Sequence, residues 1–177
     1  MASASYQTRR DEIETYFDRT AAHAWAALTS DAPVSRIRRT VRHGRDAMRQ
    51  TLMSWLPEDM TGSTLIDAGC GTGTLAIEAA QRGAEVVAVD LSPTLVNLAK
   101  ERLRYLNQTL DVTFLVGDMR DMDLGSFDYA VAMDSLIHYD VADGAQTLQA
   151  MAVQIHRKMV FTFEPKRPLL AFMHAAG

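Results

Sequence analysis

The residues that suggest chemistry stand together in the stretch TLIDAGCGTGTLAIEAA, residues 64–80. A short apolar run ends in Asp67, and Gly69, Gly71 and Gly73 follow at alternate positions. Such glycines allow a sharp turn between a strand and a helix and let a ligand approach the backbone amides, next to a helix N-terminus that attracts negative charge. Asp67 would repel a pyrophosphate, so we expect the ligand end that it faces to carry positive charge.

A parallel α/β sheet is expected to position this turn. From residue 64 onward, apolar runs alternate with helical stretches, which is typical of strands covered by helices on both faces. The predicted strands are 64–68, 85–89, 112–116, 127–132 and 158–163. The predicted helices are 9–28, 33–56, 74–82, 93–105 and 143–155. We therefore expect a helical cap that binds substrate, residues 1–60, and a ligand-binding domain, residues 61–177, within one structural unit.

Composition excludes several classes of protein. A net charge of −4 with 47% hydrophobic residues is typical of a globular domain, so disorder is not expected. No apolar stretch is long enough to span a membrane and no signal peptide is recognisable, so we expect a cytoplasmic protein. The single cysteine, Cys70, excludes an internal disulfide and a multi-cysteine zinc site. We expect no metal site and assign Cys70 no chemistry.

Charge is distributed unevenly, because residues 1–56 carry nine Lys and Arg against six Asp and Glu, whereas residues 57–177 carry nine against 16. Four arginines of the basic part would share one helix face: Arg38, Arg42, Arg45 and Arg49. A second face is apolar and consists of Ile37, Val41, Met48, Leu52 and Trp55. Two interpretations of the arginines stay open, a solvated face and a face that attracts an anionic substrate or a membrane surface. No nucleic-acid partner is expected, since no aromatic residues interleave with the arginines.

The turn at residues 67–73 resembles the first motif of class I S-adenosylmethionine-dependent methyltransferases, an acid followed by G-x-G-x-G. Three further stretches follow in the order of that family, namely VVAVDLSP with Asp90, TFLVGDMR with Asp118, and FDYAVAMDSLIHY. The resemblance implies a Rossmann-like sheet that binds S-adenosylmethionine, with Asp90 on the ribose hydroxyls and Asp118 on the adenine amino group. The cofactor-binding residues that it implies are Asp67, Ala68, Gly69, Gly71, Gly73, Asp90, Leu91, Asp118, Met119 and Met133.

A narrower resemblance covers nearly the whole chain. The stretches YFDRTAAHAW, VSRIRRTVRHGRDAM, DSLIHY and FTFEPK are similar to those of the magnesium-protoporphyrin IX methyltransferases, particularly of photosynthetic bacteria that make bacteriochlorophyll. This resemblance implies transfer of a methyl group from S-adenosylmethionine to one propionate carboxylate of a magnesium porphyrin, with S-adenosylhomocysteine as the second product. It also implies association with a magnesium chelatase subunit, and the basic helix adds the hypothesis of peripheral contact with the photosynthetic membrane.

The catalytic residues expected from this resemblance are His138, Tyr139 and Tyr16. A propionate is ionised at neutral pH and needs no general base. We therefore expect His138 to hydrogen-bond the propionate and orient it for attack on the methyl group, with Tyr139 as a second candidate.

The expected substrate-binding residues are Trp25 and three arginines whose guanidinium groups would pair with carboxylates: Arg38, Arg42 and Arg45. For Trp25 and Phe17, packing between helices is the alternative to contact with the substrate, and it is the interpretation that we favour for both. Other branches of the family have a tyrosine at the position of Thr29, so closure over the substrate need not use the same group here.

Two alternatives stay open. One is another small-molecule O- or N-methyltransferase in which His138 acts as a general base. The other is a non-catalytic fragment that binds S-adenosylmethionine, because the family fold continues after the fifth strand with a helix and a strand hairpin that this sequence lacks by comparison. The fifth strand would then have an unpaired edge.

Overall fold

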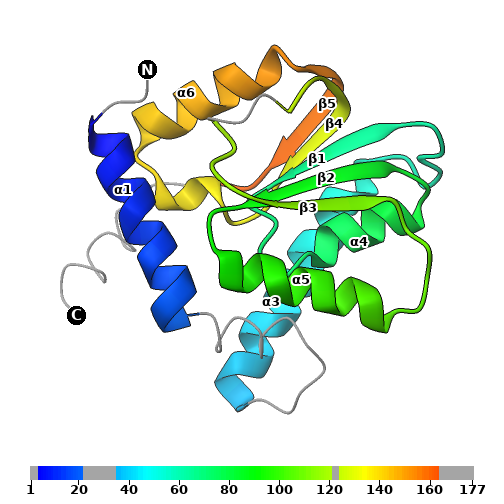
Figure 1. The fold of residues 1–177 in the computed structure, drawn as a ribbon, viewed down its shortest axis with the longest axis horizontal. Helices are drawn as coiled ribbons and strands as arrows, with labels where there is room; N and C mark the ends of the chain where they lie inside the picture. Colours follow the sequence, from blue (N-terminus) through cyan, green and yellow to red (C-terminus); the bar gives the residue numbers. More distant parts are fainter. Residues whose placement is uncertain (1–3, 22–34, 121–123, 164–177) are drawn as a thin grey trace.

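The computed structural model describes residues 4–21, 35–120 and 124–163. Five parallel strands form one sheet in the order β3-β2-β1-β4-β5 (Figure 1). They are β1 Thr64–Ala68, β2 Glu85–Asp90, β3 Val112–Val116, β4 Phe127–Ala132 and β5 Ile155–Phe161. Strand order reverses beside β1, which pairs with both β2 and β4. In open α/β sheets such a reversal leaves a crevice at the carboxyl ends of the strands.

Helices cover both faces of the sheet. One face packs against α3 (Arg36–Ser54), α4 (Thr74–Gln81) and α5 (Pro93–Tyr105), and its core includes Leu52, Leu65 and Val96. The other face packs against α6 (Val141–Ala152) around Ile66 and Met151. Because β1 is covered on both sides, four of its five residues are buried, which explains its continuous apolar run.

The N-terminal segment crosses the carboxyl edge of the sheet. Helix α1 (Ala4–Thr15) lies at this edge in Figure 1 and continues directly into a π-helix, η1 (Tyr16–Ala21). The carboxyl group of Asp18 in η1 accepts a hydrogen bond from the Thr94 amide (3.1 Å) in the first turn of α5. Arg9 donates from Nε to the carbonyl oxygen of His138 (2.8 Å) in a short 3-10 helix, η2 (Leu136–His138). The N-terminal segment is therefore attached to both halves of the sheet.

The predicted fold class is confirmed, and three predicted strands have the predicted bounds. Two predictions are wrong at the end of the sheet, because α6 ends at Ala152 and β5 begins at Ile155 rather than at residue 158. The polar run His156-Arg157-Lys158, of which only Lys158 was placed in the predicted strand, forms the exposed part of an edge strand in the structure. The predicted helix 9–28 begins earlier and changes to a π-helix at Tyr16. Residues 22–34, with Trp25 and Thr29, and residues 164–177 lie outside the described part.

The apolar face predicted for α3 is for the most part exposed and not packed against the protein. Leu52 is buried, but Ile37 and Trp55 are 79% and 55% exposed, and Val41 and Met48 are exposed as well. The helix instead turns several of its arginines toward the protein. No helix within the described ranges has the length and apolar character to cross a membrane.

Gly73 offers a direct test of the packing between the glycine turn and the sheet. Its φ is +74°, and a Cβ there would lie 2.8 Å from the Phe114 ring and 2.9 Å from the Ala99 Cβ. We expect Gly73→Ala to lower the free energy of unfolding by about 1–3 kcal/mol, measured by urea denaturation. Gly144→Ala, in α6 with open space around it, is the matched control and should leave stability unchanged or raise it by up to about 1 kcal/mol. Equal stability of both variants would contradict this packing.

Candidate active site

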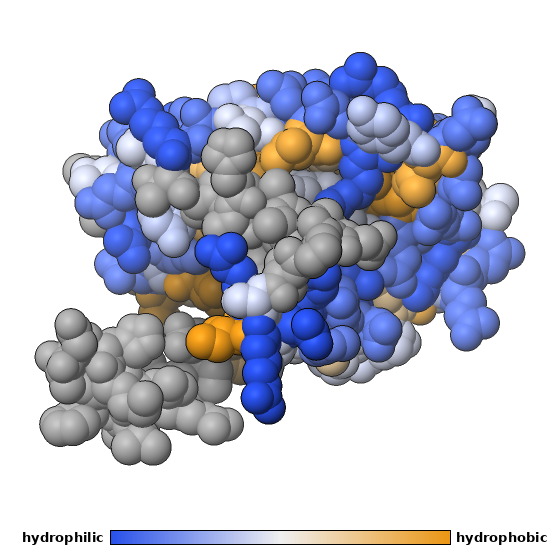
Figure 2. Space-filling model, turned by 90° about the horizontal axis from the view of Figure 1, so that it is seen from below, coloured by the Kyte–Doolittle hydropathy of each residue, from blue (hydrophilic) through white to orange (hydrophobic). Residues whose placement is uncertain are grey.

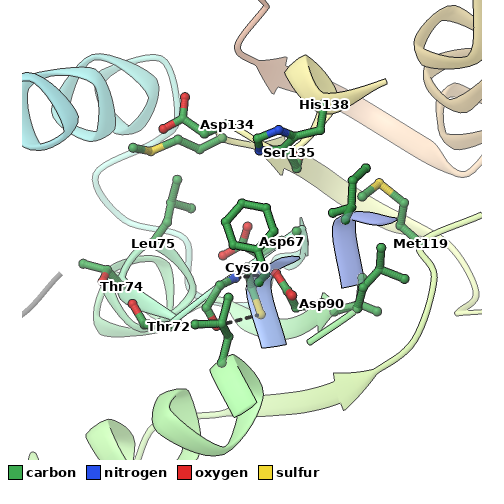
Figure 3. Close-up of a pocket in the computed structure, with 18 of the residues that line it drawn as sticks. Asp67, Cys70, Thr72, Thr74, Leu75, Asp90, Met119, Asp134, Ser135 and His138 are labelled. Carbon is green, nitrogen blue, oxygen red and sulfur yellow. Dashed lines mark hydrogen bonds between the residues drawn. The ribbon is translucent and has the colours of Figure 1, made fainter. Parts of the chain in front are cut away.

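A cavity of about 320 Å³ lies at the carboxyl ends of the strands, where the strand order reverses. The loops after β1, β2, β3 and β4 line it, together with α3 and the N-terminal segment. Figure 3 shows Asp134, Ser135 and His138 on one side of the cavity, and Asp67, Cys70 and Asp90 on the other. The cavity therefore combines residues that are far apart in the sequence.

The glycine turn follows β1, and its glycines serve the packing of the protein as well as a ligand. A Cβ on Gly69, whose φ is +83°, would lie 2.3 Å from the Ser135 Cβ, so only glycine lets the loops after β1 and β4 meet. The amides of Gly69 and Cys70 both donate to the carbonyl oxygen of Val89. Gly71 has a φ of +54° and lines the cavity.

Asp67 is a buried acid without a complete set of partners. Its side chain is 2% exposed and lines the cavity, and its Oδ2 atom accepts no hydrogen bond. Burial, and secondarily the nearby Asp90, raise the pKa of Asp67 to about 7. An unpartnered acceptor in a buried position is costly, so a hydrogen-bond donor with positive charge would be bound favourably here.

Asp90, at the end of β2, closes the turn from the other side. One of its oxygens accepts from the Gly71 amide (2.8 Å) and the other from the Ser92 amide (2.9 Å). Burial raises the pKa of Asp90 although these two hydrogen bonds oppose the shift. Each carboxylate oxygen keeps a second lone pair, so Asp90 can still accept hydrogen bonds from a ligand.

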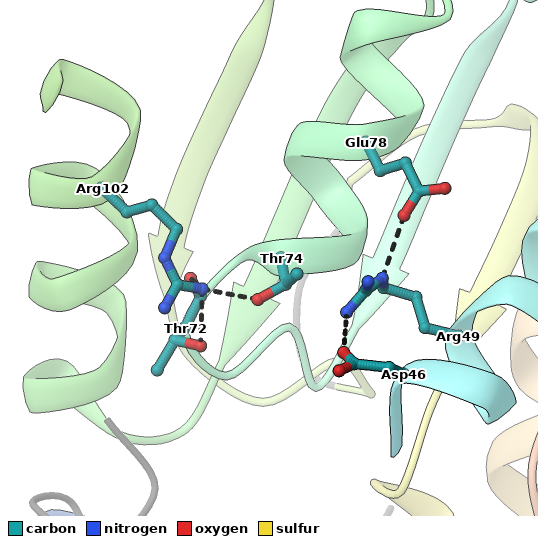
Figure 4. Close-up of polar contacts among 6 residues, drawn as sticks. All are labelled: Asp46, Arg49, Thr72, Thr74, Glu78 and Arg102. Atoms are coloured by element: carbon teal, nitrogen blue, oxygen red, sulfur yellow. Dashed lines mark hydrogen bonds and ion pairs between the residues drawn. The ribbon is translucent and has the colours of Figure 1, made fainter. Parts of the chain in front are cut away.

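Helix α3 directs arginines into the cavity, which excludes a wholly solvated face. Arg42, Arg45 and Arg49 line the cavity. Arg45 forms an ion pair with Asp134, two residues after the end of β4, where the backbone has a φ of +56°. Arg49 donates to Asp46 (2.8 Å) and to Glu78 of α4 (3.0 Å), as Figure 4 shows.

A second arginine, Arg102, contacts the glycine turn from outside the cavity. Arg102 of α5 donates to the Thr72 carbonyl oxygen (2.9 Å), to the Thr72 hydroxyl (3.0 Å) and to the Thr74 hydroxyl (Figure 4). Both threonines line the cavity, whereas Arg102 does not. Arg102 therefore fixes the shape of the turn without facing a ligand.

His138 lies on the opposite wall in a defined environment. Its ring meets that of Phe17 edge to face, with ring centroids 5.2 Å apart. Burial lowers the pKa of His138, Arg9 contributes in the same direction, and Asp134 opposes them. The imidazole is therefore neutral at pH 7. Its neighbour Tyr139 also lines the cavity, and burial raises the pKa of Tyr139 to about 12, so its phenol stays protonated.

The structure brings together most of the residues that the sequence indicated. Those that line the cavity are Asp67, Gly69, Gly71, Asp90, Leu91, Met119, Met133, Arg42, Arg45, His138 and Tyr139. Those that do not line it are Ala68, Gly73, Asp118, Tyr16 and Arg38. Asp118 is buried between Gly117 and Met119, which do line the cavity, whereas Tyr16 is 54% exposed. Trp25 lies outside the described residues.

Sequence reasoning missed several residues of the cavity. Phe17 was assigned to helix packing, yet it contacts His138 and lines the cavity beside Ile13. Asp134 stands close to the carboxyl end of a strand, as Asp67 and Asp90 do, and this shared position was the signal that could have identified it. Among the described residues, no group of three or more His, Cys, Asp or Glu side chains is arranged to hold a metal ion.

Comparison with known proteins agrees with the fold and the site. A family model described as a methyltransferase domain matches residues 65–157. The chain is 51% identical to magnesium-protoporphyrin O-methyltransferase of Rhodobacter capsulatus over 168 residues, which are 94% of this chain and 75% of that protein. It is 30% identical to the protein of the same name from Synechocystis over 171 residues, 93% of this chain and 73% of that one.

A crystal structure of magnesium protoporphyrin IX methyltransferase from Synechocystis, with bound SAH, superimposes with a TM-score of 0.88 at 27% identity and covers 96% of this chain and 78% of that one. The parallel sheet, with an acid near the end of its first strand and a glycine turn after that strand, thus defines a class I methyltransferase. The chain belongs to the magnesium-protoporphyrin O-methyltransferase family.

The buried Asp67 should make stability depend on pH in a recognisable way. Its pKa in the folded chain, about 7, lies above the ordinary value for an unfolded chain, about 4. The stability associated with Asp67 is then fully present below pH 4 and is lost as the pH rises through 7. The side chain of Asp67→Asn is neutral at every pH. The free energy of unfolding of this variant should therefore exceed that of the ligand-free wild type by more than about 1 kcal/mol at pH 8, and the difference should become much smaller by pH 5.

Urea denaturation from pH 5 to pH 8 measures this difference. The exposed Asp111→Asn is the control and should follow the wild type at each pH. An Asp67→Asn variant that is less stable than the wild type at pH 8 would show that the carboxylate is satisfied in the folded chain.

Proposed function

We propose that the chain transfers a methyl group from S-adenosylmethionine to a propionate carboxylate of magnesium-protoporphyrin IX, giving the monomethyl ester. The observation that carries this proposal is a single cavity with an unpartnered acid, Asp67, in one wall and arginines of α3 in another. The 51% identity to the Rhodobacter capsulatus enzyme over most of the chain supports the choice of acceptor.

The acidic wall fits the cofactor. Bound S-adenosylmethionine supplies a methyl group that is electrophilic because it is attached to a sulfonium. Asp67 would accept a hydrogen bond from the ammonium of its methionine part, which satisfies the free Oδ2 atom. Asp90 would accept hydrogen bonds from the ribose hydroxyls. The apolar wall beside the purine would be formed by Leu91, Met119 and Met133.

The chain's own residues have to align the nucleophile, because a propionate is already ionised at neutral pH. His138 would donate a hydrogen bond to the propionate. Since its imidazole is neutral, it can orient the carboxylate without forming an ion pair that would hold back the attacking electrons. Phe17 and Ile13 cover this part of the cavity and would exclude water.

The basic wall suits the carboxylates of the substrate. Arg42 and Arg45 line the cavity, and the ion pair of Arg45 with Asp134 already places a carboxylate beside this guanidinium. A propionate could compete with Asp134 for the same donor. Roles for Arg38, Tyr16 and Trp25 in binding the macrocycle stay predictions.

The division of the chain into a cap, residues 1–60, and a cofactor-binding domain, residues 61–177, is part of the proposal. Contacts of Arg9, Phe17 and Asp18 with the loops and helices around the cavity support it. The cap would close over the substrate while remaining part of the same structural unit. A cytoplasmic location and association with a magnesium chelatase subunit stay predictions from the sequence.

The acceptor is tested by incubating the purified chain with S-adenosylmethionine and magnesium-protoporphyrin IX and weighing the porphyrin by mass spectrometry. We expect the gain of one methyl group, dependent on both substrates. S-adenosylhomocysteine binding, measured on the same sample by calorimetry, is the control for folding. Binding of S-adenosylhomocysteine without ester formation would refute the proposed acceptor. If the chain neither binds S-adenosylhomocysteine nor forms the ester, the proposed activity is refuted for this chain.

One observation favours a second candidate, a small-molecule O-methyltransferase with His138 as general base: the pKa of His138 is lowered, so the imidazole is free to take a proton. The two candidates differ in their pH dependence. For a propionate acceptor, kcat of the wild type should be level between pH 6 and pH 9, because no proton is removed. His138→Ala should lower kcat by about 10- to 100-fold at every pH, and His138→Gln, which keeps a donor, by less.

The exposed His156→Ala on β5 is the control and should not change kcat. An acid limb in the wild-type profile that disappears in His138→Ala would identify a general base and favour the second candidate.

We propose further that the first turns of α3 contact an anionic membrane surface. Ile37 and Val41 are 79% and 46% exposed, and Arg36, Arg38 and Arg39 are exposed on the same turns. Figure 2, which views the molecule from below, shows hydrophobic and strongly hydrophilic side chains close together on this face. A basic helix with exposed apolar residues is suited to the surface of a bilayer.

Flotation with vesicles that contain phosphatidylglycerol tests this contact. The wild type should float at low salt and be released at about 0.5 M salt, because the attraction is screened. Arg38→Glu/Arg39→Glu should no longer float, whereas the matched reversal Lys100→Glu/Arg104→Glu on α5 should float as the wild type does. Flotation that resists salt or survives the reversal on α3 would refute the contact.

A further inference from the structure

Tyr6, in the first turn of α1, is a buried residue that the proposed chemistry does not use. It is 1% exposed although it stands close to the start of the chain. Its hydroxyl donates to Oδ1 of Asp118 (2.8 Å), across 112 positions of sequence. Burial, as the largest cause, raises the pKa of Tyr6, so the phenol stays protonated and can only act as a donor to this carboxylate.

The two oxygens of Asp118 have different roles. Oδ1 accepts from the Tyr6 hydroxyl and from the Arg120 amide (2.9 Å), which together use its two lone pairs. Oδ2 is buried and accepts no hydrogen bond, and the nearest cation is Arg10, whose Nε atom is 4.0 Å away. Gly117 and Met119, on either side of Asp118, line the cavity, so this acceptor lies directly behind the cavity wall although Asp118 itself does not line it.

The ring of Tyr6 reaches a second part of the same wall. It stacks on Tyr139, with centroids 4.9 Å apart and planes inclined by 12°. The guanidinium of Arg120 lies 4.1 Å from the centroid of the Tyr6 ring. Tyr139 itself lines the cavity. One side chain of α1 therefore fixes the carboxyl group after β3 and the aromatic ring after η2.

We propose that Tyr6 is a positioning residue, which turns Asp118 so that its free Oδ2 accepts a hydrogen bond from the exocyclic amino group of the purine, and thereby sets the preference for adenine. The proposal rests on the cofactor part of the proposed function, not on the porphyrin acceptor. An adenine amino group is a donor and fits an acceptor that has no hydrogen-bond partner. The carbonyl oxygen of hypoxanthine at the same position is an acceptor and would face the carboxylate unfavourably.

The experiment compares the binding of S-adenosylhomocysteine with that of S-inosylhomocysteine, in which the amino group is replaced by a carbonyl oxygen, by calorimetry. The wild type should bind the adenine compound at least about tenfold more tightly. Tyr6→Phe keeps the stacked ring but not the hydroxyl, and should reduce this preference by about three- to tenfold. Asp118→Asn should also reduce it, and the double variant should lose little more than Asp118→Asn alone.

Tyr105→Phe, on the 88% exposed side chain at the end of α5, is the matched control and should keep the wild-type preference. A Tyr6→Phe variant that keeps the wild-type preference for adenine overturns the proposal. A variant that loses affinity for both compounds equally also overturns it, because an equal loss is what a purely structural role of Tyr6 predicts. A wild type that binds neither compound overturns this proposal together with the cofactor part of the proposed function. Binding of both without ester formation would refute only the porphyrin acceptor.

Discussion

The site is organised around two carboxylates that the sheet forces close together in a buried position. Strands β1 and β2 run parallel in register, so Asp67 near the end of one and Asp90 at the end of the other reach the same edge. Hydrogen bonds from the glycine turn and the Ser92 amide offset part of the cost for Asp90, but Asp67 keeps a free oxygen. The protein bears this cost in the free state, and a cationic ligand would relieve it.

The remaining parts of the site follow from that negative edge. The basic N-terminal third of the chain supplies the counter-charges, with Arg45 on Asp134 and Arg49 on Glu78, so the uneven charge distribution in the sequence corresponds to one region of the molecule lying over another. The N-terminal segment then covers the edge through Phe17, Asp18 and Arg9. In the proposed function, closure, charge compensation and alignment of a carboxylate substrate would be carried out by the same elements.

Much of this could be predicted from the sequence, and the failures have physical reasons. The turn after β1 and the acid at the end of β2 were recognisable because each stands at the carboxyl end of an apolar strand. Tyr16 was assigned to catalysis and Phe17 to helix packing, but Phe17 is the one that lines the cavity. The segment η1 is a π-helix, and its wider turn shifts the phase that a 3.6-residue period assumes. The contact of Tyr6 with Asp118 spans 112 residues and leaves no local pattern. The edge strand β5 was displaced by three residues because its exposed half is polar.

The central claim is that the unpartnered carboxylate of Asp67 binds the cationic group of a ligand. It is tested most directly by measuring the protons released during binding. Calorimetry of S-adenosylhomocysteine binding at pH 7, in buffers with different ionisation enthalpies, gives the number of protons released. With a pKa of about 7 in the free protein, Asp67 is half protonated, and an ammonium beside it should expel about half a proton per site. This release should disappear in Asp67→Asn. Binding without proton release, or the same release from the variant, would contradict the account.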